Sequence, residues 1–438
     1  MKKVGMVSLG CAKNRVDSEN MLGMLREKGF EIVADPAEAD VLFVNTCGFI
    51  ESAKEESIDA IFEMAQYKKA GKAKRLFVTG CLAQRYPEAL MSEIPEIDGI
   101  LGVADYARLF EMMEAAEGDA RPCYTAQGAR FLKTPRVLTT PGYSAYVKIS
   151  DGCDNRCTYC AIPLIRGGYS SRPFDDIVAE CRRLAFEGVT ELTLIAQDTS
   201  RYGCDLGDGR YLLPELLEAV SAIEGVHWVR VLYCYPDSTE DRLLDAIQRL
   251  PKVAPYLDLP LQHIDDDLLR RMNRRGTADW IKSRIAECKK RGITLRTTMI
   301  VGFPGETEAQ FETLLDFVKW ARFDRLGAFT YSAEEGTPAA VMPDQIDEDV
   351  KQRRLDDLMM LQQSISMEAN QARVGETCEV LVDGYDDEEG RFYGRSLLEA
   401  PESDGCIWLS TDRDLTPGEY VQVRITGADA YDLEGEVL

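Results

Sequence analysis

The chain has 438 residues, 45% of them hydrophobic, and a formal net charge of −24 at pH 7. A chain of this length holds two to four domains with their own cores, and its acidity argues against a surface that binds nucleic acid throughout. No apolar run approaches the roughly 20 residues that cross a bilayer, and no signal peptide is recognisable, so we expect a cytoplasmic protein without a membrane partner. In that reducing compartment, the thirteen cysteines are expected to be metal ligands and scattered thiols rather than disulfides.

The first 135 residues alternate short apolar strands with amphipathic helices, which is typical of a parallel sheet covered by helices. Three of the predicted strands end just before Cys11, Cys47 and Cys81. The carboxyl ends of parallel strands lie along one edge of a sheet, where ligands bind. We therefore expect these three thiols to converge. The alternative is that they are ordinary buried cysteines beside strands.

The middle of the chain begins after a polar, proline-containing stretch at 132–143, which is predicted to be a linker. Six strands, separated by helical segments, are predicted at 145–150, 191–197, 226–234, 256–262, 293–301 and 325–332. Strand and helix units with right-handed crossovers predict a partial TIM-like (β/α)6 barrel, with a doubly wound sheet as the alternative.

The C-terminal segment follows a long charged helix predicted at 347–373. Its short strands alternate with Gly and Asp turns, which is typical of a small antiparallel β-barrel of OB-like type. From residue 372 to the end there are seventeen Asp and Glu against five Arg and no Lys, a net charge of −12. We expect an α/β protein with three domains at 1–135, 140–370 and 372–438.

The sequence SDGCDNRCTYC at 150–160 places Cys153, Cys157 and Cys160 after the first strand of the predicted barrel. A structural zinc site needs four ligands, and no second cysteine pair follows at a suitable distance. A 4Fe-4S cluster has four irons, so three thiolates leave one iron open to a cofactor. The motif therefore predicts a 4Fe-4S cluster.

The spacing Cys-x-x-x-Cys-x-x-Cys at this place resembles the radical S-adenosylmethionine enzymes. The resemblance implies that S-adenosylmethionine binds the open iron and is cleaved to methionine and a 5'-deoxyadenosyl radical, with Tyr159 near the adenine. MIVGFPGET, with Gly302 and Glu306, resembles the turn of that family beside the cofactor, and Gln197 is expected to bind cofactor or substrate. The alternatives are a turn followed by an acidic residue at a helix start, and a polar cap at a strand end.

The order of domains resembles the methylthiotransferases across the whole chain, and SLGCAKNRVDSE, VNTCGFI and VTGCLAQRY match the cysteine contexts of that family. The resemblance implies that Cys11, Cys47 and Cys81 hold a second 4Fe-4S cluster and that the C-terminal domain is a TRAM domain. S-adenosylmethionine then acts both as methyl donor and as radical source. A sulfur donor and an electron donor protein are implied as partners.

This family splits by substrate. One branch thiomethylates an adenosine of transfer RNA, and another the β-carbon of an aspartate in the strongly basic ribosomal protein S-twelve. The acidic C-terminal domain should repel RNA and attract a basic protein, and SLGCAKNRVDSE and MNRRGT resemble the second branch. We expect ribosomal protein S-twelve as substrate, with nucleic acid not the primary target. Modification of transfer RNA, and an iron-sulfur carrier without catalysis, are the alternatives.

Two further groups are predicted to be structural. Arg270, Arg271, Arg274 and Arg275 in RRMNRR are expected on a solvated helix surface. The remaining cysteines have no ligand-like spacing and are expected to be structural thiols: Cys123, Cys181, Cys204, Cys234, Cys288, Cys378 and Cys406. No side chain is assigned as an acid or base catalyst.

Overall fold

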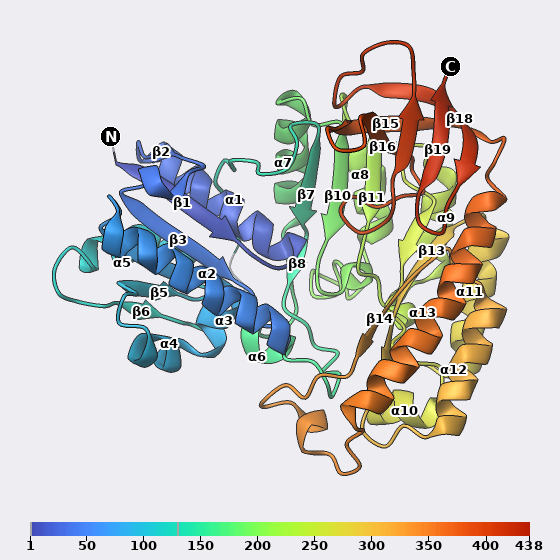
Figure 1. The fold of residues 1–438 in the computed structure, drawn as a ribbon, viewed down its shortest axis with the longest axis horizontal. Helices are drawn as coiled ribbons and strands as arrows, with labels where there is room; N and C mark the ends of the chain where they lie inside the picture. Colours follow the sequence, from blue (N-terminus) through green and yellow to red (C-terminus); the bar gives the residue numbers. More distant parts are fainter. Residues whose placement is uncertain (1, 129–130) are drawn as a thin grey trace.

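The chain forms an N-terminal α/β domain, a half-open barrel and a small closed barrel, in that order along the sequence (Figure 1). The computed structural model describes residues 2–128 and 131–438. Within these ranges, none of the helices is both long enough and apolar enough to span a bilayer.

The N-terminal domain is a six-stranded parallel sheet in the order β2-β1-β3-β4-β5-β6. The strands are β1 (Lys3–Ser8), β2 (Glu31–Ile32), β3 (Val41–Thr46), β4 (Arg75–Thr79), β5 (Gly99–Leu101) and β6 (Cys123–Tyr124). The helices are α1 (Ala12–Glu27), α2 (Glu51–Ala70), α3 (Gly80–Arg85), α4 (Pro87–Glu93) and α5 (Leu109–Ala115). Helices cover both faces of this sheet, so successive residues of β3 point into two different hydrophobic cores. Phe43 belongs to one core and Leu42 to the other.

The central domain contains the six predicted parallel strands, each followed by helical structure. They are β7 (Ser144–Lys148), β10 (Glu191–Ile195), β11 (Trp228–Val231), β12 (Tyr256–Asp258), β13 (Thr294–Val301) and β14 (Arg325–Thr330). The ladders β7-β10-β11 and β12-β13-β14 are joined through a parallel bridge between Val229 and Val253. The strands follow one another across the sheet in chain order from β7 to β14, without the reversal of a doubly wound sheet, so the domain is a partial barrel with β7 and β14 at its edges.

Helices cover the outer face of this barrel: α7 (Phe174–Phe186), α8 (Leu213–Ser221), α9 (Asp241–Arg249), α11 (Ala278–Lys290), α12 (Glu308–Ala321) and α13 (Glu348–Gln371). The short helix α10 (Asp266–Arg271) packs near the loop that follows β7. Along β13, Leu295, Met299 and Val301 are buried among the helices, whereas the alternating residues are half-buried. Since side chains alternate across a strand, the half-buried set faces the interior of the barrel, which is open.

The C-terminal domain is a closed barrel in the order β15-β16-β17-β19-β18. Its strands are β15 (Thr377–Asp386), β16 (Arg391–Arg395), β17 (Ile407–Ser410), β18 (Tyr420–Ala428) and β19 (Leu433–Val437). Four of these strands were expected from the sequence, whereas β19 was not, because its sequence LEGEV alternates only weakly between apolar and polar residues. Strand β19 pairs parallel with β17, and all other pairs in this barrel are antiparallel. Arg395 joins this barrel to the central domain by two 3.0 Å hydrogen bonds to Glu191.

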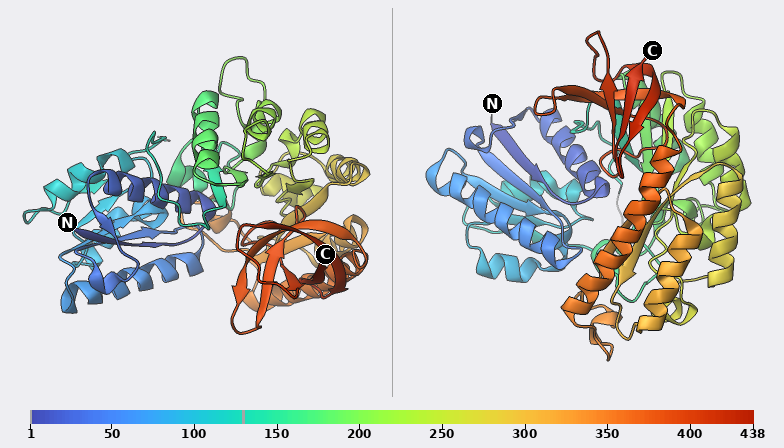
Figure 2. Two further views of the ribbon diagram at one scale, coloured as in Figure 1. Left: turned by 90° about the horizontal axis from the view of Figure 1, so that it is seen from above. Right: turned by 45° about the vertical axis from the view of Figure 1, so that its right-hand side comes forward.

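The segment 132–143, expected to be a linker, is an ordered strap between the first two domains. Buried Arg136 lies 3.5 Å from Glu19 of α1 and 3.1 Å from Glu180 of α7. Thr139 donates its backbone N–H and its hydroxyl to the same Glu19. With α1 packed on β7, this strap holds the N-terminal domain beside the barrel, as both views of Figure 2 show.

Candidate functional site

Cys11, Cys47 and Cys81 follow β1, β3 and β4, which are neighbours in the N-terminal sheet. Cys47 comes directly after β3, Cys81 lies in the first turn of α3, and Cys11 precedes the first residue of α1. Burial raises the pKa of Cys81 to about 12, and negative charge on Cys11 and Cys47 adds to this effect. The structure thus brings these three thiols to one edge of the sheet.

Four polar side chains that the sequence analysis did not single out tie the three loops together. The Asn14 amide donates to the carbonyls of Leu9 and Thr46, at 2.8 and 3.2 Å. The Thr79 hydroxyl donates to Asn45 Oδ1 at 3.1 Å, and the Thr46 hydroxyl to the Thr79 carbonyl at 2.6 Å. All four are buried. Their only signal in the sequence is a position within three residues of a cysteine that follows a strand.

Glycines allow the loops to approach. Gly10 and Gly80 have φ of +83° and +95°, a region that other L-residues rarely adopt. A Cβ on Gly10 would lie 2.9 Å from Cys47 Sγ, and one on Gly80 would collide with Asn45 Oδ1. Glycine is therefore needed directly before Cys11 and Cys81.

The Cys11 thiol has a different electrostatic environment. The Cys11 side chain is exposed, but the protein atoms around it still desolvate the thiol, which disfavours the thiolate. The positive charges of Lys13 and Arg166, together with two backbone N–H groups, outweigh this desolvation. The pKa of Cys11 is therefore lowered. Cys11 is thus the readiest of these three thiols to lose its proton when a metal binds.

The loop with Cys153, Cys157 and Cys160 leaves the carboxyl end of β7. A two-stranded ribbon of β8 (Ser150–Asp151) and β9 (Ser170–Ser171) holds its base, and α6 (Ile162–Arg166) follows it. Asn155 donates its amide to Asp198 at 2.8 Å, so the end of β10 supports the loop. Burial raises the pKa of Cys153 to about 11, and the charge on Cys157 adds to it.

The expectation of a solvated helix surface was wrong for part of RRMNRR. Arg270 and Arg275 are exposed, but the Arg274 guanidinium lies 3.9 Å from Cys157 Sγ and 4.0 Å from the ring centre of Tyr235. Asn273 donates its amide to the carbonyl of Arg156, at 2.9 Å. The segment turns back from α10 over the cysteine loop, which periodicity along the helix could not reveal.

Tyr159 and Gln197 lie at this end of the barrel. Tyr159 is half-buried and packs against an apolar cluster that includes Leu268 and Phe303. Both polar atoms of the Gln197 amide are buried and have no hydrogen-bond partner among the described residues. Because buried polar groups are nearly always paired, Gln197 is a candidate for binding a polar ligand.

Gly302 and Glu306 have structural contacts. Gly302 has φ +73°, and a Cβ there would collide with the stem of Lys351. The Glu306 carboxylate is fully buried, pairs with Arg354 at 2.9 Å and with His263 at 3.2 Å, and accepts the Gly302 N–H. These contacts favour the structural alternative, a turn closed by an acidic residue, for Glu306.

A buried ionic network joins the two groups of cysteines. Arg166 of α6 lies 3.0 Å from Asp17 of α1 and 3.1 Å from Asp151 of β8, and its guanidinium donates to Cys81 Sγ at 3.6 Å. Lys148 of β7 pairs with the same two carboxylates. Asp151 lies two residues before Cys153, so the two groups lie on either side of one domain junction.

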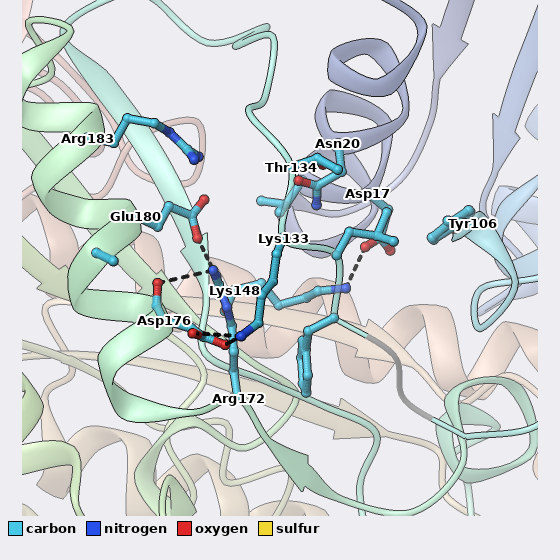
Figure 3. A pocket seen from close by; sticks show the side chains of 14 residues that line it. Asp17, Asn20, Tyr106, Lys133, Thr134, Lys148, Arg172, Asp176, Glu180 and Arg183 are labelled. Atoms are coloured by element: carbon cyan, nitrogen blue, oxygen red, sulfur yellow. Dashed lines mark hydrogen bonds and ion pairs between the residues drawn. The ribbon is translucent and has the colours of Figure 1, made fainter. Parts of the chain in front are cut away.

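A pocket of about 230 Å³ borders this network, where α1, the segment 131–134 and α7 meet (Figure 3). Its charged side chains form the pairs Lys133–Asp176, Arg172–Glu180 and Lys148–Asp17. Because most of its charges are already neutralised within the protein, we interpret the pocket as a gap in the junction rather than as a ligand site.

The donor atoms fit iron-sulfur clusters. Among the described residues, no three His, Cys, Asp or Glu side chains are placed to hold a single metal ion. A 4Fe-4S cluster differs, because each thiolate binds a different iron. Thiols are ligands for such clusters rather than for hard cations. Beside the second group, Gln197, Asn155 Oδ1 and the Tyr235 hydroxyl are buried without hydrogen-bond partners in the part of the chain that the structure describes, which fits a polar cofactor.

Three segments of the chain match known families. Residues 3–102 match Uncharacterized protein family UPF0004, residues 147–318 the Radical SAM superfamily and residues 374–438 the TRAM domain. Among solved structures, the radical S-adenosylmethionine methyltransferase TsrM from Kitasatospora setae, with cobalamin and a 4Fe-4S cluster bound, has a TM-score of 0.57 at 14% identity, covering 86% of this chain and 76% of that one. This likeness shows a shared fold.

Curated relatives match along the whole chain. The protein named ribosomal protein uS12 methylthiotransferase RimO is 51% identical in Desulforamulus reducens, 48% in Caldicellulosiruptor saccharolyticus and 46% in Thermoanaerobacter sp., and each match covers 100% of both chains. Such identity over the full length shows that the chain belongs to the RimO family of radical S-adenosylmethionine methylthiotransferases.

Proposed function

We propose that this protein inserts a methylthio group at the β-carbon of an aspartate in ribosomal protein uS12, the substrate that its relatives are named for. The observation that carries the proposal is the placement of two groups of three thiols on either side of one domain junction, joined through Arg166. One 4Fe-4S cluster with S-adenosylmethionine is enough to generate a radical. The insertion of sulfur also requires a group nearby that supplies the sulfur, which is the role proposed for the second cluster.

The proposed ligands are Cys153, Cys157 and Cys160 for a 4Fe-4S cluster that binds S-adenosylmethionine, and Cys11, Cys47 and Cys81 for a second 4Fe-4S cluster. When bound, these groups supply the methyl group, the sulfur and the radical that removes hydrogen from carbon. We propose Gln197 and Tyr159 as cofactor contacts, supported by the orphaned amide and by the apolar packing of the ring. Gly302 and Glu306 shape the adjacent turn.

The rest of the chain holds the substrate and excludes water. Thr298 and Ile300 of β13 are half-buried and alternate with residues that pack against the helices, so we propose that they line the interior of the half-open barrel. A radical step needs the reacting carbon held close and water kept out, more than it needs a strong base.

Charge supports a basic protein as substrate. The C-terminal domain, with a net charge of −12, would repel phosphates and attract a protein rich in Lys and Arg.

The proposed partners also include an electron donor protein and a sulfur donor. With a ribosomal protein as substrate, we propose that the reaction takes place in the cytoplasm. The proposed domains are 1–135, 140–370 and 372–438, supported by the strap at 132–143 and by the end of α13 at Gln371.

The decisive experiment incubates anaerobically reconstituted protein with S-adenosylmethionine, reductant, sulfide and uS12, followed by mass spectrometry of uS12 peptides. We expect a methylthio group on one aspartate and none on nucleosides of transfer RNA supplied in parallel. A methylthio group on the RNA alone would overturn the proposed substrate.

Two cysteine variants test the ligands. We expect about eight irons per chain in the wild type and about four after triple replacement of Cys11, Cys47 and Cys81 by Ala. The triple variant should still form 5'-deoxyadenosine but add no sulfur, whereas Cys157→Ala should form none. Loss of both activities in the triple variant would contradict this division of roles.

A further inference from the structure

Lys13 is a buried lysine without a carboxylate partner. Three lysines are buried among the residues that the structure describes. Lys148 pairs with Asp17 and Asp151, and Lys351 with Glu348 at 2.7 Å. Lys13 is 8% exposed, yet no carboxylate of the described ranges lies within 4.0 Å of its Nζ. Since a buried charge is stable only when it is paired, Lys13 needs an anionic partner that the described carboxylates do not supply.

An aromatic ring holds this ammonium. Lys13 Nζ lies 3.2 Å from the ring centre of Tyr233, which follows β11 at the carboxyl end of the barrel. A ring face attracts a cation but leaves its other donors free, and Lys Nζ has three. The contact therefore orients the Lys13 ammonium but leaves N–H donors free for an anion.

The backbone of Tyr233 is strained to present the ring. Its φ is +62°, a region that costs a bulky residue free energy. The conformation is maintained by Asp258, which accepts the Tyr233 N–H at 3.0 Å, and by Thr199, whose N–H donates to the Tyr233 carbonyl at 2.9 Å. Strain of this kind is concentrated at functional sites.

The neighbouring strand ends carry unpaired polar atoms. Gln197 follows β10, and Gln262, with φ +72°, follows β12. The side-chain carbonyl oxygens of both are buried and accept no hydrogen bond from residues 2–128 or 131–438. Lys13 thus lies where the carboxyl ends of the barrel strands meet the loop of Cys11. Arg15 pairs with Glu402, so the C-terminal domain also helps to fix the position of the start of α1.

We propose that Lys13, seated on Tyr233, binds the side-chain carboxylate of the substrate aspartate and thereby selects aspartate as the residue to be modified. This inference rests on the function proposed above. The ammonium would hold the β-carboxylate where the loop of Cys11 meets the carboxyl ends of the barrel strands. The competing partner for Lys13 is the thiolate of Cys11, two residues away, and the experiment must separate these two roles.

The test measures binding of uS12, and of uS12 in which the modified aspartate is replaced by Asn, to the reconstituted holoenzyme. Wild-type protein should prefer the Asp form about 10- to 100-fold, the range of one charge-assisted hydrogen bond. Lys13→Met should lose this preference by weakening the Asp form alone, and Lys13→Arg should keep part of it. Lys13→Gln serves the same comparison if the Met variant does not fold.

Lys28→Met is the matched control, because Lys28 follows the same helix and lies over an aromatic ring, 5.3 Å from the centre of Phe110. It should retain the full preference. Equal weakening of both substrates by Lys13→Met, or loss of about four irons per chain, would overturn the proposal and assign Lys13 to the interface or to the cluster. A wild type that modifies no aspartate of uS12 would overturn the proposed function itself.

Discussion

The guanidinium of Arg166 lies 3.6 Å from Cys81 Sγ, although the two residues belong to different domains. Arg166 is 2% exposed, and Asp17 and Asp151 neutralise its charge. Arginine suits this position because its planar fork donates in several directions at once. One side chain therefore links the N-terminal thiols, helix α1 and the strand that leads to Cys153.

Replacing Arg166 by Met should lower the free energy of unfolding by about 3–5 kcal/mol, because it leaves the buried carboxylates of Asp17 and Asp151 with Lys148 as their only cationic partner among the described residues. Arg166→Lys should recover part of this loss. Urea unfolding followed by circular dichroism measures it, with Arg270→Met, which breaks an exposed pair with Asp267, as a neutral control. An unchanged unfolding midpoint for Arg166→Met would show that the network adds nothing to stability.

Arg274 should raise the reduction potential of the neighbouring cluster. A cation 3.9 Å from Cys157 Sγ favours the reduced, more negative state. Arg274→Gln should lower the midpoint potential by roughly 60 mV, equivalent to a tenfold change in a one-electron equilibrium. A redox titration followed by electron paramagnetic resonance measures the shift. Arg275→Gln, at an exposed residue next in the chain, should leave the potential unchanged.

Gly80→Ala should reduce iron binding by the N-terminal domain. Gly80 and Gly29 both have positive φ, +95° and +81°, so alanine costs about 1 kcal/mol of backbone strain at either. Only at Gly80 would the new Cβ also collide with Asn45 and Thr46, whereas it would meet nothing within 4 Å at Gly29. Iron analysis after reconstitution should therefore find less iron in Gly80→Ala than in Gly29→Ala. Equal iron contents would show that the close approach of Gly80 to Asn45 and Thr46 is not needed for iron binding.

The contact between Glu191 and Arg395 should make stability depend on pH. Burial alone would raise the pKa of Glu191, but the charge and hydrogen bonds of Arg395 outweigh it and hold the pKa below its usual value. Its contribution is therefore complete above the unfolded pKa of about 4.3 and is lost as the pH falls through the lower folded value.

Unfolding free energies measured from pH 7 down to pH 3 should fall less steeply for Glu191→Gln than for the wild type. The variant should be less stable at pH 7, because among the described residues Arg395 then retains only Asp383 as an anionic partner. Glu388→Gln, in the exposed turn between β15 and β16, is the control and should follow the wild-type curve. Parallel curves for wild type and Glu191→Gln would exclude this coupling.

Regular patterns accounted for most of the architecture. The six barrel strands and the three strands before Cys11, Cys47 and Cys81 were predictable because short apolar runs and turn residues are local signals. Strand β19 was not, because Gly435 and its neighbouring glutamates give little periodicity. The function of RRMNRR was also missed, since Arg274 contacts a cysteine 117 residues earlier in the chain.

The sequence by itself determined the order of domains, the two groups of three cysteines and the acidity of the last domain, because spacing and composition are properties of the chain alone. The tertiary structure decided which other residues share the site. Arg166, Arg274 and the pair Lys13–Tyr233 come close to the thiols or to the barrel opening only when separate strand ends are packed together. Such contacts leave no local pattern, because the free energy that places each side chain comes from partners more than a hundred residues away or in another domain.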